Sequence, residues 1–193
     1  MESEPPKTDP PKRKRRWFQF SLRALMIFTA LVAVAAATLG TRISRKRNEH
    51  DAVEVMRKSG GFVSYDSYKS EPSGPHWLRV LLGDNFFSEV VSVGFDFSTR
   101  PLGDGELANL ERFTNLRDLN IRGCDVTAPG MAHVKGLSQL VWIDFQRTNV
   151  NDAELVNLTG LVRLQDLNLE KTQVTEAGIK DLQKALPNCK IIR

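Results

Sequence analysis

Residues 137–160 read LSQLVWIDFQRTNVNDAELVNLTG, and the segments on either side repeat this pattern without a gap: FTNLRDLNIRGCDVTAPGMAHVKG at 113–136 and LVRLQDLNLEKTQVTEAGIKDLQK at 161–184. The period is 24 residues, and apolar side chains occupy five matched positions in each copy. These positions hold Leu116, Leu140 and Leu164; Leu119, Ile143 and Leu167; Ile121, Phe145 and Leu169; Val126, Val150 and Val174; and Met131, Leu155 and Ile179. A fixed period of this length predicts stacked units, because one unit cannot bury its own apolar face.

Each copy combines two local patterns. It opens as L-x-x-L-x-L, whose last apolar residues alternate with a polar one, as a short strand with one buried face requires. It closes with apolar residues at helical spacing, preceded by the capping residues Thr127, Asn151 and Thr175. Asn151 and Glu154 have the spacing of a capping box. Each copy therefore predicts a strand, a turn and a short helix.

The repeats continue weakly toward the N-terminus. Val90, Val93 and Phe95 fit a strand, and Leu107 and Leu110 fit the helix that follows it. Two extra residues near 99–101 make this copy divergent. We expect a fourth unit at this place in the stack.

Both ends of a stack need a cap, and the sequence offers two candidates. Ala52, Val53 and Met56 share one helical face, Gly60-Gly61 would end that helix, and residues 62–65 have strand composition. At the other end, Pro187 stops the last helix and residues 188–191 would return one final strand.

These repeats resemble the leucine-rich repeat family in the variant L-x-x-L-x-L-x-x-T-x-V-T. Thr148-x-Val150 and Thr172-x-Val174-Thr175 fit this pattern, and Cys124 replaces the threonine in the first full copy. Bacterial membrane-anchored members look similar along more of the chain, including Arg15-Arg16-Trp17-Phe18 and the segment from Trp77 to Gly83. The resemblance implies an α/β solenoid with a short parallel sheet on the concave side and short helices on the convex side.

The N-terminal part has the composition of a membrane anchor. Residues 24–41 carry no charge, and a helix of this length spans about 27 Å, close to a hydrocarbon core of about 30 Å. Trp17, Phe18 and Phe20 would lie at the membrane interface. We therefore divide the chain into a disordered basic tail (1–16), a membrane anchor (17–43), a linker with the N-terminal cap (44–87) and the repeats with the C-terminal cap (88–193).

The basic residues beside the anchor predict its orientation. Seven precede the span and four follow it, which favours a cytoplasmic N-terminus and an extracytoplasmic repeat domain. A cleaved signal peptide is the alternative, since Ala35-Ala36-Ala37 supplies small residues of the A-x-A kind. The basic cluster that begins at Arg42 favours a retained anchor.

Charge is distributed unevenly along the chain. Residues 1–47 hold 11 Lys/Arg and 3 Asp/Glu, so the remaining 16 Lys/Arg and 20 Asp/Glu give residues 48–193 a net charge of −4. A nucleic-acid-binding domain needs a basic face, and the predicted folded part is acidic. We therefore expect no nucleic-acid partner.

The residue types also argue against a catalytic or cofactor site. His50, His76 and His133 are not spaced as metal ligands or as members of a catalytic triad, so we predict no enzyme, no metal site and no cofactor. Cys124 and Cys189 lie about three strand spacings apart, roughly 14 Å, and we expect no disulfide between them.

Strand alternation places polar side chains on the sheet face that points away from the core. At the centre, Trp142 would be an exposed aromatic residue, a type common at binding hot spots. We hypothesise that this concave face binds an unknown protein or another extended ligand; the alternative is a structural or envelope-organising protein with a solvated polar face. The candidate ligand-binding residues are Asp118, Asn120, Arg122, Trp142, Asp144, Gln146, Asp166, Asn168 and Glu170.

Overall fold

The structure is a computed structural model, and it describes residues 22–66, 76–82, 88–95 and 103–193. Its contacts divide the chain into two compact units, residues 1–42 and residues 43–193. Three sequence predictions lie outside the described residues: the basic tail, the interfacial aromatic residues 17–20 and the extra residues near 99–101.

The first described element is helix α1, Leu22–Lys58, with 37 residues. Its N-terminal stretch is long and apolar enough to cross a membrane, and none of the most apolar 18-residue window is buried by protein. Exposed side chains include Leu25, Phe28 and Leu31, which would be costly to leave in water. The chain therefore has one N-terminal helix suited to a membrane span or a signal anchor.

The C-terminal part of α1 packs on the sheet of the second unit. Ala52, Val53 and Met56 are buried, which confirms the helical face expected for the N-terminal cap. No glycine or proline stands between Gly40 and Gly60, so residues 44–58 continue the helix and form no separate linker. The helix ends at Lys58, and Gly60 in the turn that follows has a φ of 79°, which suits a residue without a side chain.

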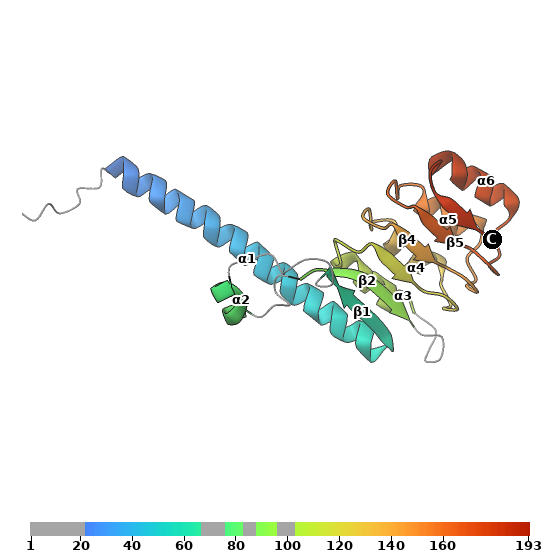
Figure 1. The fold of residues 1–193 in the computed structure, drawn as a ribbon, viewed down its shortest axis with the longest axis horizontal. Helices are drawn as coiled ribbons and strands as arrows, with labels where there is room; N and C mark the ends of the chain where they lie inside the picture. Colours follow the sequence, from blue (N-terminus) through green and yellow to red (C-terminus); the bar gives the residue numbers. More distant parts are fainter. Residues whose placement is uncertain (1–21, 67–75, 83–87, 96–102) are drawn as a thin grey trace, which may run out of the picture. The chain divides into compact units, whose positions relative to one another are not determined.

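The second unit contains a six-stranded sheet in the order β1-β2-β3-β4-β5-β6 (Figure 1). Strand β1 pairs antiparallel with β2, and every later pair is parallel. The bounds are Gly61–Tyr65 for β1, Val90–Phe95 for β2, Asp118–Asn120 for β3, Trp142–Asp144 for β4, Asp166–Asn168 for β5 and Lys190–Ile192 for β6. From β2 onward, the strands lie in the order expected from repeating units.

A short helical segment follows each of the strands β2 to β5, as the repeat pattern predicts. These segments are α3 (Asp104–Ala108) with η3 (Asn109–Arg112), α4 (Ala128–Val134), α5 (Asp152–Leu155) with η4 (Val156–Leu158), and α6 (Glu176–Ala185). The remaining helix, α2 (His76–Leu82), lies between β1 and β2 in the chain. Thr127, Asn151 and Thr175 cap α4, α5 and α6, and Asn151 forms the expected capping box with Glu154.

One apolar core runs through the second unit, because the matched apolar positions of successive units contact one another. Of the five positions in the three full copies, all are buried except Ile179, which is partly buried and packs against the core. The divergent copy contributes Val90, Val93, Leu107 and Leu110 to the same cluster. The fold is thus mixed α/β, with one face of the sheet in the core and the other outside it.

Candidate ligand-binding surface

The sheet face outside the core carries the nine residues predicted from alternation, and we call these nine residues the open face. Its central row crosses the strands at Asp118, Trp142 and Asp166, which are direct register partners. The next row joins Asn120, Asp144 and Asn168 in the same way. The predicted columns are therefore confirmed, and Trp142 lies between two aspartates on adjacent strands.

The register also extends both rows to strands whose contribution the sequence did not reveal. The Trp142 row continues to Ser92 and Ser64 on one side and to Lys190 on the other. The Asp144 row continues to Gly94 and Phe62, and at the other end to Ile192. Alternation within the repeats could not place Phe62, because β1 lies outside the repeats and runs antiparallel.

Phe62 lies directly over Gly94. A Cβ atom built on Gly94 would come within 2.1 Å of the Phe62 ring, so only glycine leaves room for this contact. The ring nevertheless remains 52% exposed. The Asp144 row therefore has an apolar residue at each end, since Ile192 is also exposed.

Three side chains of the Asp144 row stabilise the ends of their strands. The Oδ1 atoms of Asn120, Asp144 and Asn168 each accept a hydrogen bond from the backbone N–H two residues later, at 3.2, 2.8 and 3.0 Å. Such turns satisfy backbone donors where a strand ends. These oxygens are therefore engaged in holding the strand ends, which the sequence pattern alone did not indicate.

Two predicted ligand-binding residues are buried, which corrects the expectation that the whole face is exposed. Asp144 is 7% exposed and Gln146 is 8% exposed. Both side chains turn back onto the protein: the Asp144 carboxylate accepts from the Gln146 N–H, and the Gln146 amide donates to Glu170. The other seven residues of the open face are partly exposed, and this includes Trp142.

A third row lies just beyond the strand ends and contains Arg122, Gln146 and Glu170. The Gln146 amide donates a hydrogen bond from Nε2 to the Glu170 carboxylate. Its other atom, Oε1, is buried and has no hydrogen-bond partner among the residues that the structure describes. A buried acceptor without a donor is costly to stability.

Trp142 differs from the other large apolar residues of the repeats. It is partly exposed, and it belongs neither to the buried core nor to the partly buried apolar residues packed against that core. An aromatic side chain in this position contributes little to the core and is available for contact with a ligand.

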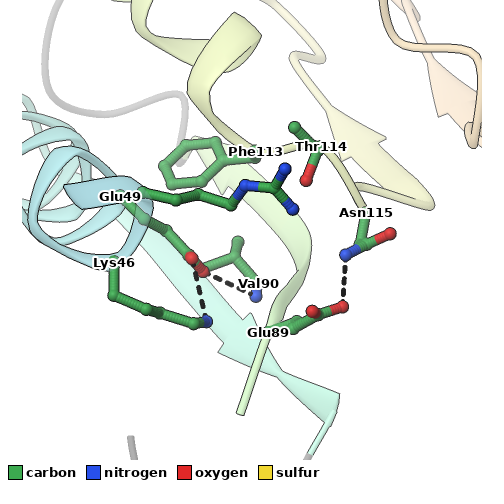
Figure 2. A pocket seen from close by; sticks show the side chains of 8 residues that line it. Lys46, Glu49, Glu89, Val90, Phe113, Thr114 and Asn115 are labelled. Atoms are coloured by element: carbon green, nitrogen blue, oxygen red, sulfur yellow. Dashed lines mark hydrogen bonds and ion pairs between the residues drawn. The ribbon is translucent and has the colours of Figure 1, made fainter. Parts of the chain in front are cut away.

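A separate small pocket lies where the C-terminal part of α1 meets β2 and the loop after η3. Figure 2 shows Lys46 and Glu49 on the helix, Val90 on the strand, and Phe113, Thr114 and Asn115 on the loop. Glu49 is buried, and its carboxylate accepts from the Val90 N–H at 3.0 Å and pairs with Lys46 at 2.9 Å. Lys46 also donates to the Ser88 carbonyl, and Asn115 donates to Glu89.

The pocket residues therefore mostly satisfy one another, which indicates a structural junction. We did not predict Glu49 as a buried group from the sequence. The signal was present, because Glu49 precedes Ala52, Val53 and Met56 by three, four and seven residues and so shares their helical face.

Reactive groups are scarce in the part of the chain that the structure describes. There, no three His, Cys, Asp or Glu side chains gather as they would around a metal ion. Cys124 and Cys189 are both free and buried. Burial raises the pKa of each thiol to about 11, with the nearby Asp166 adding to the effect at Cys189, so both thiols remain protonated at neutral pH.

Comparison with known proteins adds no further assignment. No protein-family model matches the chain. No curated protein matches it either.

Proposed function

We propose that the chain is a membrane-tethered interaction protein of the leucine-rich repeat type, whose open face binds a protein or another extended ligand. The 24-residue period and its in-register strands support the family assignment. The observation that carries the binding function is Trp142, an aromatic side chain outside the core at the centre of the face. The proposal assigns the chain a binding role and no catalytic one.

The membrane part of the proposal rests on α1. Its exposed apolar stretch would span the bilayer as a retained anchor, and the seven basic residues before the span against four after it favour a cytoplasmic N-terminus. The sheet would then lie outside the cytoplasm and meet partners there.

One observation favours a second candidate, a structural protein without a specific ligand. The side chains of Asn120, Asp144 and Asn168 hydrogen-bond to their own backbone, so this row stabilises the strand ends and offers fewer groups to a ligand. If the rest of the face is merely solvated, stacking of the units is the function.

Photo-crosslinking in intact cells would distinguish the two candidates. Lys190 is exposed at one end of the Trp142 row, so a photoreactive amino acid placed there would lie beside a bound ligand. We expect a specific crosslinked product with the wild-type face. Loss of a hot-spot tryptophan costs about 2 kcal/mol or more, so Trp142→Ala should reduce apparent affinity by roughly thirtyfold or more.

The matched control is Trp77→Ala, the same substitution at a tryptophan on α2 that is 67% exposed. This variant should give the wild-type crosslink, and the thermal midpoint of Trp142→Ala should stay close to that of the wild type. An absent product, or one that Trp142→Ala leaves unchanged, would favour the structural alternative.

A further inference from the structure

The surroundings of Trp142 indicate which chemistry its ligand carries. Its register partners on both sides are aspartates, Asp118 and Asp166, at the strand spacing of about 4.8 Å. An indole face attracts cations through its quadrupole, and a carboxylate attracts them through its charge. The central row thus places two kinds of cation-attracting group side by side.

A nearby acidic residue favours the same chemistry. Glu170, in the same row as Gln146, adds another carboxylate. A ligand that matches this part of the face therefore carries positive charge.

Two cations lie at the margins of the face and have to be considered. Lys190 is the register partner of Asp166 and is exposed at the end of the row. Arg122 belongs to the third row, is partly buried and already has an interaction within the chain. Neither residue is a register partner of Trp142, whose partners are both acidic.

We infer that the open face binds an extended protein segment through an arginine side chain that stacks on Trp142 and pairs with the Asp166 carboxylate. A guanidinium group fits better than an ammonium group, because it is planar, stacks on aromatic rings and donates two parallel hydrogen bonds to one carboxylate. This inference rests on the proposed binding function and names the partner's chemistry.

The length of the row sets the length of a suitable probe. Six strands give five spacings of about 4.8 Å, or roughly 24 Å, which an extended chain at about 3.3 Å per residue crosses with about seven residues. The probe is therefore a fluorescein-labelled seven-residue peptide of alternating glycine and arginine. The control peptide carries citrulline in place of arginine, which keeps the shape and removes the charge.

The test measures fluorescence anisotropy with the full chain in detergent micelles. We expect saturable binding of the arginine peptide and about tenfold weaker binding of the citrulline peptide, since a desolvated cation–π contact with its ion pair contributes on this scale. Trp142→Ala should weaken arginine binding about tenfold, while Trp142→Phe should retain most of it because an aromatic face remains.

Charge specificity needs a matched pair of variants, because a cationic peptide also binds acidic proteins diffusely. Asp166→Asn should weaken binding about fivefold. Asp181→Asn removes an equally charged, exposed carboxylate from α6 and should leave binding unchanged. Equal effects of these two substitutions would overturn the inference, as would equal affinity for both peptides or no saturable binding up to about 1 mM.

These outcomes separate the inference from the proposed function. If the crosslink at Lys190 depends on Trp142 but the arginine peptide fails, the face binds a partner of different chemistry and only the inference is wrong. If the crosslink is also independent of Trp142, both are wrong.

Discussion

At the scale of single residues, the repeat places three equivalent positions in the left-handed region of backbone space. Gly123, Arg147 and Lys171 are 24 residues apart and have φ values of 66°, 60° and 57°. A side chain in this conformation costs about 1–2 kcal/mol, whereas glycine adopts it freely. Of the three repeats, only the first has glycine at this position, the residue that the left-handed conformation favours.

Arg147→Gly should therefore stabilise the fold. The relief of about 1–2 kcal/mol exceeds the cost of about 0.5–1 kcal/mol that glycine adds through the entropy of the unfolded chain. We expect a net gain of about 0.5–1 kcal/mol in the free energy of unfolding, measured by urea denaturation of the detergent-solubilised chain. Arg147→Ala removes the same side chain without relieving the backbone, so it should show no such gain. A glycine variant no more stable than the alanine variant would contradict the argument.

At the scale of elements, carboxylates at helix starts link successive units. Asp152 begins α5, and its two oxygens accept from the Thr175 N–H at 2.7 Å and the Thr175 hydroxyl at 2.6 Å, where α6 is capped. Asp104 likewise accepts a hydrogen bond from the Thr127 hydroxyl, between α3 and α4. A side chain on Gly178 would collide with the Asp152 carboxylate, with 2.3 Å between its Cβ and Oδ1, so the glycine makes room for the link.

The start of α5 is stabilised differently. Ala128 takes the place of the aspartate at the start of α4, so no carboxylate reaches the cap of α5 from the preceding unit. Asn151 instead forms a capping box with Glu154, which occupies the position held by glycine in the other two helices. The start of α5 is thus stabilised by a capping box, whereas the starts of α4 and α6 are stabilised by a carboxylate from the preceding repeat.

The link through Asp152 predicts a pH dependence of stability. The hydrogen bonds from Thr175, first from its hydroxyl and then from its backbone N–H, lower the pKa of Asp152 below its ordinary value of 3.8. A lowered pKa means that this contribution is fully present above the unfolded value and is lost as the pH falls through the folded value. Asp152→Ala should therefore reduce the thermal midpoint at pH 7, and its difference from the wild type should shrink below about pH 4.

Asp181→Ala is the control for this experiment, because Asp181 is an exposed carboxylate whose partner Lys184 lies on the same helix. It should change the midpoint little at either pH. A difference between wild type and Asp152→Ala that stays constant down to the lowest pH at which the chain is folded would show that the charge is irrelevant to the link.

At the scale of the whole molecule, the sheet is closed at its two ends by different devices. The C-terminal part of α1 and the antiparallel strand β1 cover one end, where the buried Glu49 carboxylate binds the Val90 N–H. At the other end, β6 pairs with β5, and Leu186 and Cys189 are buried just before it. Stacked units depend on such caps because their terminal apolar faces have no further neighbour.

Deletion of residues 186–193 should therefore strongly destabilise the domain formed by residues 43–193. The deletion removes the buried side chains of Leu186 and Cys189 and the partly buried side chain of Ile191, whose burial together stabilises the fold by about 4–5 kcal/mol. It also exposes the apolar end of the last repeat. At about 2–4 °C per kcal/mol for a chain of this size, the thermal midpoint should fall by roughly 10 °C or more. Deletion of residues 1–16 is the control and should leave the midpoint unchanged. An unchanged midpoint after the C-terminal deletion would show that this segment is not a cap.

The sequence by itself determined the features that depend on local chemistry and on repetition. The 24-residue period predicted the strand order and the columns through Trp142 and Asp144, because identical units stacked in order must bring equivalent residues together. The helix caps followed from residue type, since a side-chain oxygen at that place satisfies a free N–H. The apolar N-terminal stretch was equally plain from composition.

Only the tertiary structure decided how much of each side chain remains available. Asp144 and Gln146 alternate with core residues just as their equivalents do, yet they are buried while those equivalents on β3 and β5 remain partly exposed. Phe62 joins the face through an antiparallel pairing that no repeat encodes. Exposure and long-range pairing depend on what the rest of the chain places around a residue, and a local pattern carries no information about that.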